Sequence, residues 1–135
     1  MTDFIFVYGT LLKTATNMHN VLARHCEYFS DGYMQGILYD VDGYPGAVES
    51  EKQNEKIYGE LYTLGNSELV LAILDEYEEC TAKHPAPHEY IRKKITVSRD
   101  GEDTVSAWVY VFNRDVSNLR QIESGDYLNY LNETE

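Results

Sequence analysis

The clearest candidate for chemistry in this sequence is a carboxylate near the end of a predicted helix. The stretch NSELVLAILDEYEEC at 66–80 carries four acidic residues among its last six. A carboxylate that is partly desolvated and close to a helix C-terminus has a raised pKa, because both effects disfavour the charged form. Such a group is suited to general acid/base catalysis.

Helical periodicity sorts these carboxylates without singling one out. The side chains that recur at helical spacing form an apolar arc, which consists of Leu69, Val70, Ile73, Leu74 and Tyr77. Asp75 and Glu79 are predicted to lie on the far side of this arc, whereas Glu76 and Glu78 lie at its two edges. A solvated glutamate at a helix end is the simpler interpretation of Glu78, so a functional role needs support from elsewhere in the chain.

A second candidate follows the first predicted strand, in the stretch VYGTLL at 7–12. Gly9 lets the backbone approach a ligand without a Cβ in the way. The consecutive amides of Gly9, Thr10 and Leu11 can then point at an anionic oxygen as the chain leaves the strand. An ordinary turn after a strand explains the same residues, and the physical signal alone leaves both interpretations open.

Strands dominate the elements that would position these residues. Segments rich in β-branched and aromatic residues, separated by turn signals, predict strands at 4–8, 33–41, 57–63, 90–98 and 105–112. The Asp100-Gly101 pair predicts an antiparallel hairpin of the last two, and VDGYPG predicts a turn at 41–46. Helices are predicted at 17–25 and, capped by Asn66 or Ser67, within 66–80. The balance indicates an α+β fold with a curved or closed sheet and a helix packed on it.

Length and charge limit the functions open to the chain. At 135 residues it is predicted to form one domain, 1–135, and its 43% hydrophobic content favours a folded globule. The net charge of −12 argues against nucleic acid and anionic membranes as partners, because both attract a basic face. A small or cationic ligand is easier to accommodate.

Metal binding and membrane insertion are not predicted. Cys26 and Cys80 lack CxxC spacing, and prolines beside His84 and His88 break the helix that would bring these two side chains together. The opening MTDFIFVYG does not have the pattern of a signal peptide, and the chain has no apolar stretch long enough to cross a bilayer. The default expectation is a soluble cytoplasmic protein.

Seven stretches, taken in order, resemble a known family over nearly the whole chain. They are VYGTLL (7–12), GILYDVDGYPGAV (36–48), YGELYTL (58–64), LDEYE (74–78), EYIRKKITV (89–97), AWVYVFNR (107–114) and IESGDYL (122–128). Together they look like the γ-glutamylcyclotransferase-like (AIG2-like) family. Within it the chain is most similar to the small bacterial members, and next to the γ-glutamylamine cyclotransferases.

This resemblance implies a small mixed β-barrel with flanking helices and one cavity. The implied activity is the cleavage of a small γ-glutamyl amine or amide by intramolecular attack of the α-amine, which releases 5-oxoproline and a free amine without a metal or organic cofactor. The loop that holds the γ-glutamyl group would consist of Tyr8, Gly9, Thr10 and Leu11. Glu78 would be the catalytic base, and Tyr127 would supply an aromatic wall where many relatives read SGDW.

A second glutamate matches an alternative pattern of the family. Some small bacterial relatives lack the glutamate of LDxYE and carry one directly before Y-x-R, which here is Glu89. Glu78 is favoured because it ends a helix with a defined apolar face, whereas Glu89 follows the proline-containing stretch KHPAPH. Glu79 and Cys80 stand where relatives often have glycine, so a non-catalytic module that binds a small amide or amino acid is the alternative function. A purely structural or interaction protein is a third possibility.

Overall fold

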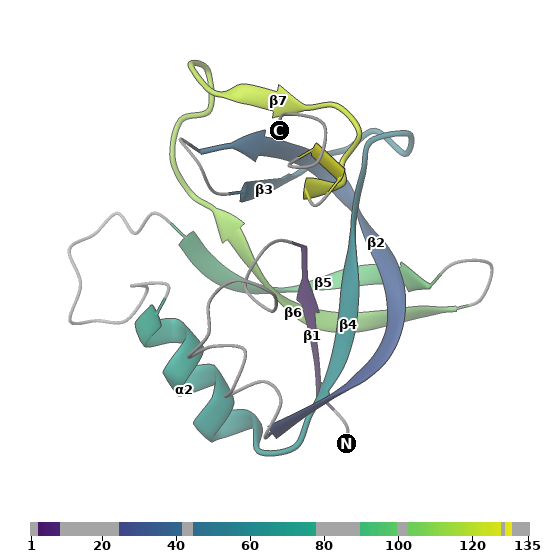
Figure 1. Ribbon diagram of the computed structural model, residues 1–135, viewed down its shortest axis with the longest axis vertical. Coiled ribbons are helices and arrows are strands. Elements are labelled where there is room, and N and C mark those ends of the chain that lie inside the picture. Colours follow the sequence, from purple (N-terminus) through teal and green to yellow (C-terminus); the bar gives the residue numbers. More distant parts are fainter. Residues whose placement is uncertain are drawn as a thin grey trace.

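The architecture is taken from a computed structural model, which describes residues 3–8, 25–41, 45–77, 90–99, 103–127 and 129–130. The strands are β1 (Asp3–Val7), β2 (Cys26–Asp40), β3 (Pro45–Glu49), β4 (Lys56–Leu64), β5 (Tyr90–Arg99), β6 (Thr104–Phe112) and β7 (Arg120–Ile122). One helix, α2 (Ser67–Tyr77), lies between β4 and β5 in the described part of the chain and packs beside the sheet (Figure 1). None of the described helical residues forms a helix long and apolar enough to cross a membrane.

Five strands close into a barrel. Their order is β2-β4-β1-β6-β5, and β5 pairs back to β2 through Gly32 with Arg99 and Tyr33 with Ser98. β1 runs parallel to β6, whereas the other neighbours in the ring are antiparallel. The later part of β2 pairs with β3 and β7 on either side, at the upper end of the molecule in Figure 1. The structure is therefore the α+β fold with a closed mixed barrel that the sequence predicted.

β1 is buried on both of its faces because it lies between the barrel interior and α2. Phe6 belongs to the cluster inside the barrel, together with residues of β2, β4, β5 and β6. Ile5 and Val7 point the other way and belong to a second cluster that includes Val70 and Leu71 of α2. Successive side chains of a strand alternate between faces, so the uninterrupted apolar run FIFV serves both clusters.

α2 begins as predicted, but its buried face is rotated from the predicted one. The side chain of Asn66 caps the helix by accepting a hydrogen bond from the Leu69 amide, with an N···O distance of 3.3 Å. Leu69 is 43% exposed, whereas Leu71 is only 8% exposed. Asp75, four residues after Leu71, shares that face and is largely buried, with 19% of its side chain exposed. The prediction that Asp75 lies on the solvent side is wrong, because its carboxylate accepts hydrogen bonds from side chains on β5 and β6.

All five predicted strands are present, and the sequence missed two more. β3 starts at Pro45, inside the predicted turn at 41–46, which is possible because proline is tolerated at the first residue of a strand. The early part of β2 was missed because Glu27, Tyr28 and Phe29 are all exposed and break the expected alternation beside a register shift. The antiparallel pairing of β5 with β6 is confirmed, although residues 100–102 of its turn lie outside the described part. The predicted helix at 17–25 also lies outside it, apart from His25.

The stretch IESGDYL fastens the C-terminal part of the chain to the barrel. Gly125 has a φ of +70°, and a Cβ built there would lie 1.9 Å from the main-chain oxygen of Lys56. The Gly125 carbonyl accepts a hydrogen bond from the Tyr58 amide at 2.8 Å. The next residue, Asp126, accepts a hydrogen bond from the Asn129 amide at 3.1 Å and caps the turn that follows. Only glycine combines this backbone angle with so close an approach to β4.

Replacing Gly125 with alanine should therefore destabilise the protein strongly. We expect the free energy of unfolding to fall by about 2–4 kcal/mol, because the new Cβ collides with main-chain atoms at a strained backbone angle. Urea unfolding followed by circular dichroism measures the effect. Glu123→Ala, at an exposed neighbouring position, should change the free energy by about 0.5 kcal/mol or less. Equal stabilities for the two variants would contradict this role of Gly125.

Candidate active site

Tyr8 directly follows β1 and fixes the end of that strand. Its hydroxyl donates a hydrogen bond to the Tyr110 carbonyl at an O···O distance of 2.5 Å and accepts a longer one from the Ala47 amide at 3.4 Å. The parallel pairing of β1 with β6, through Ile5 and Trp108, explains why Tyr8 and Tyr110 lie at the same end of the barrel. The residue before Gly9 is thus bound to both β6 and β3.

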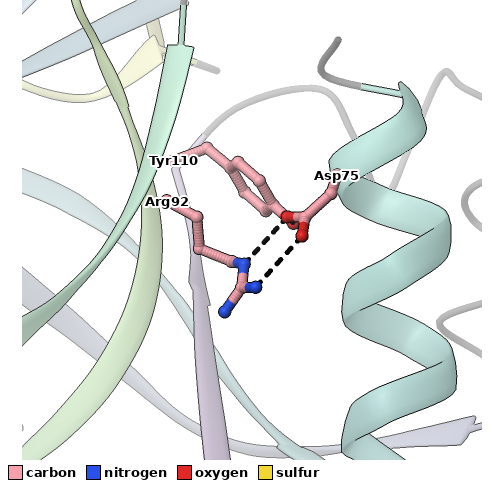
Figure 2. A network of polar contacts seen from close by, with 3 residues as sticks. All are labelled: Asp75, Arg92 and Tyr110. Carbon is pink, nitrogen blue, oxygen red and sulfur yellow. Dashed lines mark hydrogen bonds and ion pairs between the residues drawn. The ribbon is translucent and has the colours of Figure 1, made fainter. Parts of the chain in front are cut away.

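The hydroxyl of Tyr110 connects this end of the barrel to α2. It donates a hydrogen bond to Asp75 Oδ1 at 2.7 Å. Arg92, which is directly opposite Tyr110 in the β5–β6 ladder, binds the same carboxylate through Nε at 2.8 Å and Nη2 at 3.0 Å. Figure 2 shows the three side chains meeting in the space between the helix and the strands. The last turn of α2 is therefore held to the strands by three hydrogen bonds.

The ion pair in this network is more than a surface contact. The side chains of Arg92 and Asp75 are 25% and 19% exposed, and the bond is bidentate, which restricts both groups. The guanidinium also lies over the Trp108 ring, with its Cζ 4.4 Å from the ring centre. The sequence does not identify Asp75 as the partner of Arg92, because the pair joins positions 17 residues apart on different elements.

The predicted site residues divide into two groups. Tyr8 and Tyr127 are described, and both belong to or pack against the cluster inside the barrel. Tyr127 is 3% exposed and its ring stacks on Tyr130, with ring centres 6.2 Å apart. Burial, together with the nearby charge of Asp40, raises the pKa of the Tyr127 hydroxyl. The remaining predicted residues lie outside the described part of the chain: Gly9, Thr10, Leu11, Glu78 and Glu89.

An open cleft of about 610 Å³ reaches the end of β1 from the side of β2 and β4. Val7 and Tyr8 form one part of its wall, and the exposed ring of Tyr58 forms another. The charged residues among its described lining are three carboxylates and one amine, contributed by Asp31, Glu60, Asp126 and Lys56. The described part of the lining therefore carries a net negative charge next to the strand end that holds Tyr8. Among the described residues, no group of three His, Cys, Asp or Glu side chains is placed to hold a metal ion.

Comparison with known proteins identifies the family. The family model described as "Gamma-glutamyl cyclotransferase, AIG2-like" matches residues 5–129. The chain belongs to this γ-glutamyl cyclotransferase family. The "Gamma-glutamylcyclotransferase family protein YtfP" from Escherichia coli strain K12 is 34% identical over 126 residues, which cover 92% of this chain and 95% of that protein. Gamma-glutamylaminecyclotransferase A from Danio rerio is 27% identical over 114 residues, which cover 78% of this chain and 66% of that protein.

Solved structures agree with membership of the γ-glutamyl cyclotransferase family. The solution structure of ytfP from Escherichia coli has a TM-score of 0.65 at 34% identity, covering 94% of this chain and 97% of that one. The crystal structure of an AIG2-like protein from Mus musculus has a TM-score of 0.60 at 22% identity, covering 82% of this chain and 76% of that one. At that lower identity the likeness concerns the fold alone. The predicted family resemblance and barrel are both confirmed.

In this γ-glutamyl cyclotransferase family member, the contacts of Asp75 and Tyr110 are not predicted by the sequence. Asp75 lies within the LDEYE stretch but was assigned to the solvent side. Tyr110 is 6% exposed, and no pattern in the sequence indicates its hydrogen bonds to Tyr8 and Asp75. One signal for Asp75 was present, namely its spacing of four residues from Leu71.

The Arg92–Asp75 pair should contribute more to stability than its exposed neighbour. Arg92→Gln is expected to lower the free energy of unfolding by about 1.5–3 kcal/mol, because it leaves a largely buried carboxylate without its bidentate partner. Lys93→Gln removes an ion pair with Glu49 whose side chains are 45% and 46% exposed. That loss should cost less than about 1 kcal/mol. Urea unfolding of the two variants tests the difference, and an equal loss would contradict it.

Proposed function

We propose that this family member is an enzyme that cleaves a γ-glutamyl amine or amide and releases 5-oxoproline and a free amine. The observation that carries the proposal is the family match over residues 5–129. The relative named Gamma-glutamylaminecyclotransferase A supports a γ-glutamyl amine as the substrate class. The negative charge of the cleft beside Tyr8 supports a neutral or cationic leaving amine over an anionic one.

The reaction needs a base, because the substrate's α-amine is an ammonium at neutral pH and cannot attack its own γ-carbonyl. In the proposed mechanism Glu78 removes one proton from that ammonium. The amine nitrogen then forms a bond to the γ-carbon and closes the five-membered ring. The bond from the γ-carbon to the departing nitrogen breaks, and the protonated Glu78 returns the proton to this nitrogen. The ring nitrogen still carries one proton more than the lactam nitrogen, and Glu78, ionised again, removes this second proton and passes it to the released amine. The products are the lactam and the amine in its ammonium form, so atoms and charge balance.

The loop after β1 has two roles in this proposal. The amides of Gly9, Thr10 and Leu11 stabilise the negative charge that develops on the γ-carbonyl oxygen. They also help to hold the γ-glutamyl chain folded on itself, and such orientation accelerates an intramolecular attack. Tyr127 contributes an aromatic wall. The hydrogen bonds of the Tyr8 hydroxyl support this assignment, because they fix the strand end from which the loop departs.

The match of LDEYE at 74–78 to the family pattern LDxYE supports Glu78 as the base. Asp75 of the same stretch is bonded to β5 and β6 rather than facing solvent. The alternative base, Glu89, directly precedes Tyr90, the first residue of β5. The Tyr90 hydroxyl donates a hydrogen bond to the Pro45 carbonyl at 2.6 Å. Glu89 remains the second candidate.

The test is release of 5-oxoproline from a panel of γ-glutamyl amines and dipeptides, with cationic, neutral and anionic leaving amines. We expect turnover without added cofactor and a higher kcat/KM for cationic than for anionic leaving groups. Glu78→Gln should lower kcat by about 10²–10⁴-fold, because the base is lost. Glu68→Gln, an exposed change in the first turn of the same helix, should leave kcat within about twofold.

Three results would revise the proposal in different ways. A large loss of activity in Glu89→Gln but not in Glu78→Gln would move the base to the second candidate. Tight binding of γ-glutamyl amines without product would favour the non-catalytic binding module. The absence of both turnover and binding across the panel would contradict the proposed function altogether.

A further inference from the structure

Tyr110 forms hydrogen bonds through two of its groups, the main-chain carbonyl to Tyr8 and the side-chain hydroxyl to Asp75. Its main-chain carbonyl accepts the hydrogen bond of the Tyr8 hydroxyl at 2.5 Å, and its own hydroxyl donates to Asp75 at 2.7 Å. Tyr8 lies at the end of β1, and Asp75 lies in the last turn of α2, 67 positions later in the chain. A single residue of β6 therefore connects the strand end and the helix end that the proposed reaction uses.

The connection to α2 constrains the rotation of the helix as well as its distance from the barrel. Asp75 Oδ1 accepts hydrogen bonds from Tyr110 Oη and Arg92 Nε, and Oδ2 accepts one from Arg92 Nη2. Because both carboxylate oxygens are bound, the carboxylate plane is fixed and the helix cannot rotate about its axis without breaking a bond. The last turn of a helix has unsatisfied carbonyls and frays readily, so an anchor at this position determines its geometry.

We propose that Tyr110 is a positioning residue for the cyclisation: through its hydrogen bond to Asp75 it holds the end of α2 at a fixed position relative to the Tyr8 end of β1. The proposal rests on the proposed function, in which the base follows α2 and the γ-glutamyl loop follows Tyr8. Ring closure requires the amine, the γ-carbon and the base to be aligned. A displacement of about 1 Å in such an arrangement lowers the rate about 100-fold without removing any reacting group.

Tyr110→Phe separates the two connections of this residue. It deletes the hydroxyl that binds Asp75 and leaves in place the main-chain carbonyl that binds Tyr8. We expect kcat for γ-glutamyl amines to fall about 10- to 100-fold, because the helix end is released. KM should stay within about twofold, because Tyr8 still fixes the strand from which the substrate-holding loop departs.

Tyr90→Phe is the matched control. Tyr90 is as buried as Tyr110, at 6% exposure, and its hydroxyl also donates one short hydrogen bond, to the Pro45 carbonyl at 2.6 Å. It lies on the neighbouring strand β5, and its hydroxyl is bonded to β3 rather than to α2. Both variants should lower the urea midpoint by a similar amount, but Tyr90→Phe should keep kcat within about twofold. Equal losses of kcat in the two variants would overturn the proposal, since the loss would then be a general effect of packing.

A double-mutant comparison tests whether Tyr110 acts through Asp75. If it does, Asp75→Asn combined with Tyr110→Phe should lower kcat no further than Asp75→Asn alone. Independent, multiplicative losses would contradict the proposed route. A rise in KM with unchanged kcat in Tyr110→Phe would also contradict it, because it would assign Tyr110 to substrate binding.

Hydrogen exchange gives a readout that does not depend on activity. Amides of residues 71–77 should exchange faster in Tyr110→Phe than in the unmodified protein, and should be unaffected in Tyr90→Phe. Unchanged exchange in Tyr110→Phe would overturn the anchoring role even if the enzyme is active. Faster exchange in a protein that turns over no γ-glutamyl amine would instead preserve the anchor, contradict the proposed function, and remove Tyr110 from any role in cyclisation.

Discussion

Among the residues that the structure describes, Asp75 is the one whose side chain joins α2 to the barrel strands by hydrogen bonds. Its two oxygens accept hydrogen bonds from Arg92 and Tyr110, two residues that face each other in the β5–β6 ladder. Apolar packing of Val70 and Leu71 holds α2 near the sheet but is not directional. The hydrogen bonds to Asp75 supply direction, and they determine which side of the last helical turn faces the strands.

Closure of the barrel fixes the relative positions of the strands that carry these contacts. β2 pairs with β4 on one side and reaches β5 on the other, so the five strands form a ring in which β5 is not left as an edge strand and β1 and β6 are held between paired neighbours. The parallel alignment of β1 with β6 then brings Tyr8 to Tyr110. Gly125 adds a further fixed point, because its carbonyl binds β4 at the Tyr58 amide. The rigidity of the proposed site thus comes from pairing between strands that are distant from it in sequence.

Much of this arrangement could be predicted from local sequence, and the remainder depends on distant partners. Runs of β-branched and aromatic residues gave the positions of five strands, and Asn66 marked the start of α2. The rotation of the helix was not predicted, because periodicity counts apolar side chains and the decisive residue, Asp75, is charged and shares only its spacing from Leu71 with the buried face. Its partners stand 17 and 35 residues away on other elements. β3 was missed because Pro45 is typical of a turn, yet it occupies the first position of the strand, where a missing amide proton costs little.

The central claim is that the glutamate following α2 and the loop following Tyr8 act on one γ-glutamyl group. A crystal structure with bound 5-oxoproline tests it most directly. The proposed mechanism predicts the lactam nitrogen within about 3.2 Å of the Glu78 carboxylate, and the lactam oxygen facing the amides of Gly9 to Leu11. Binding of 5-oxoproline elsewhere, or with its nitrogen beside Glu89 and not Glu78, would contradict the claim.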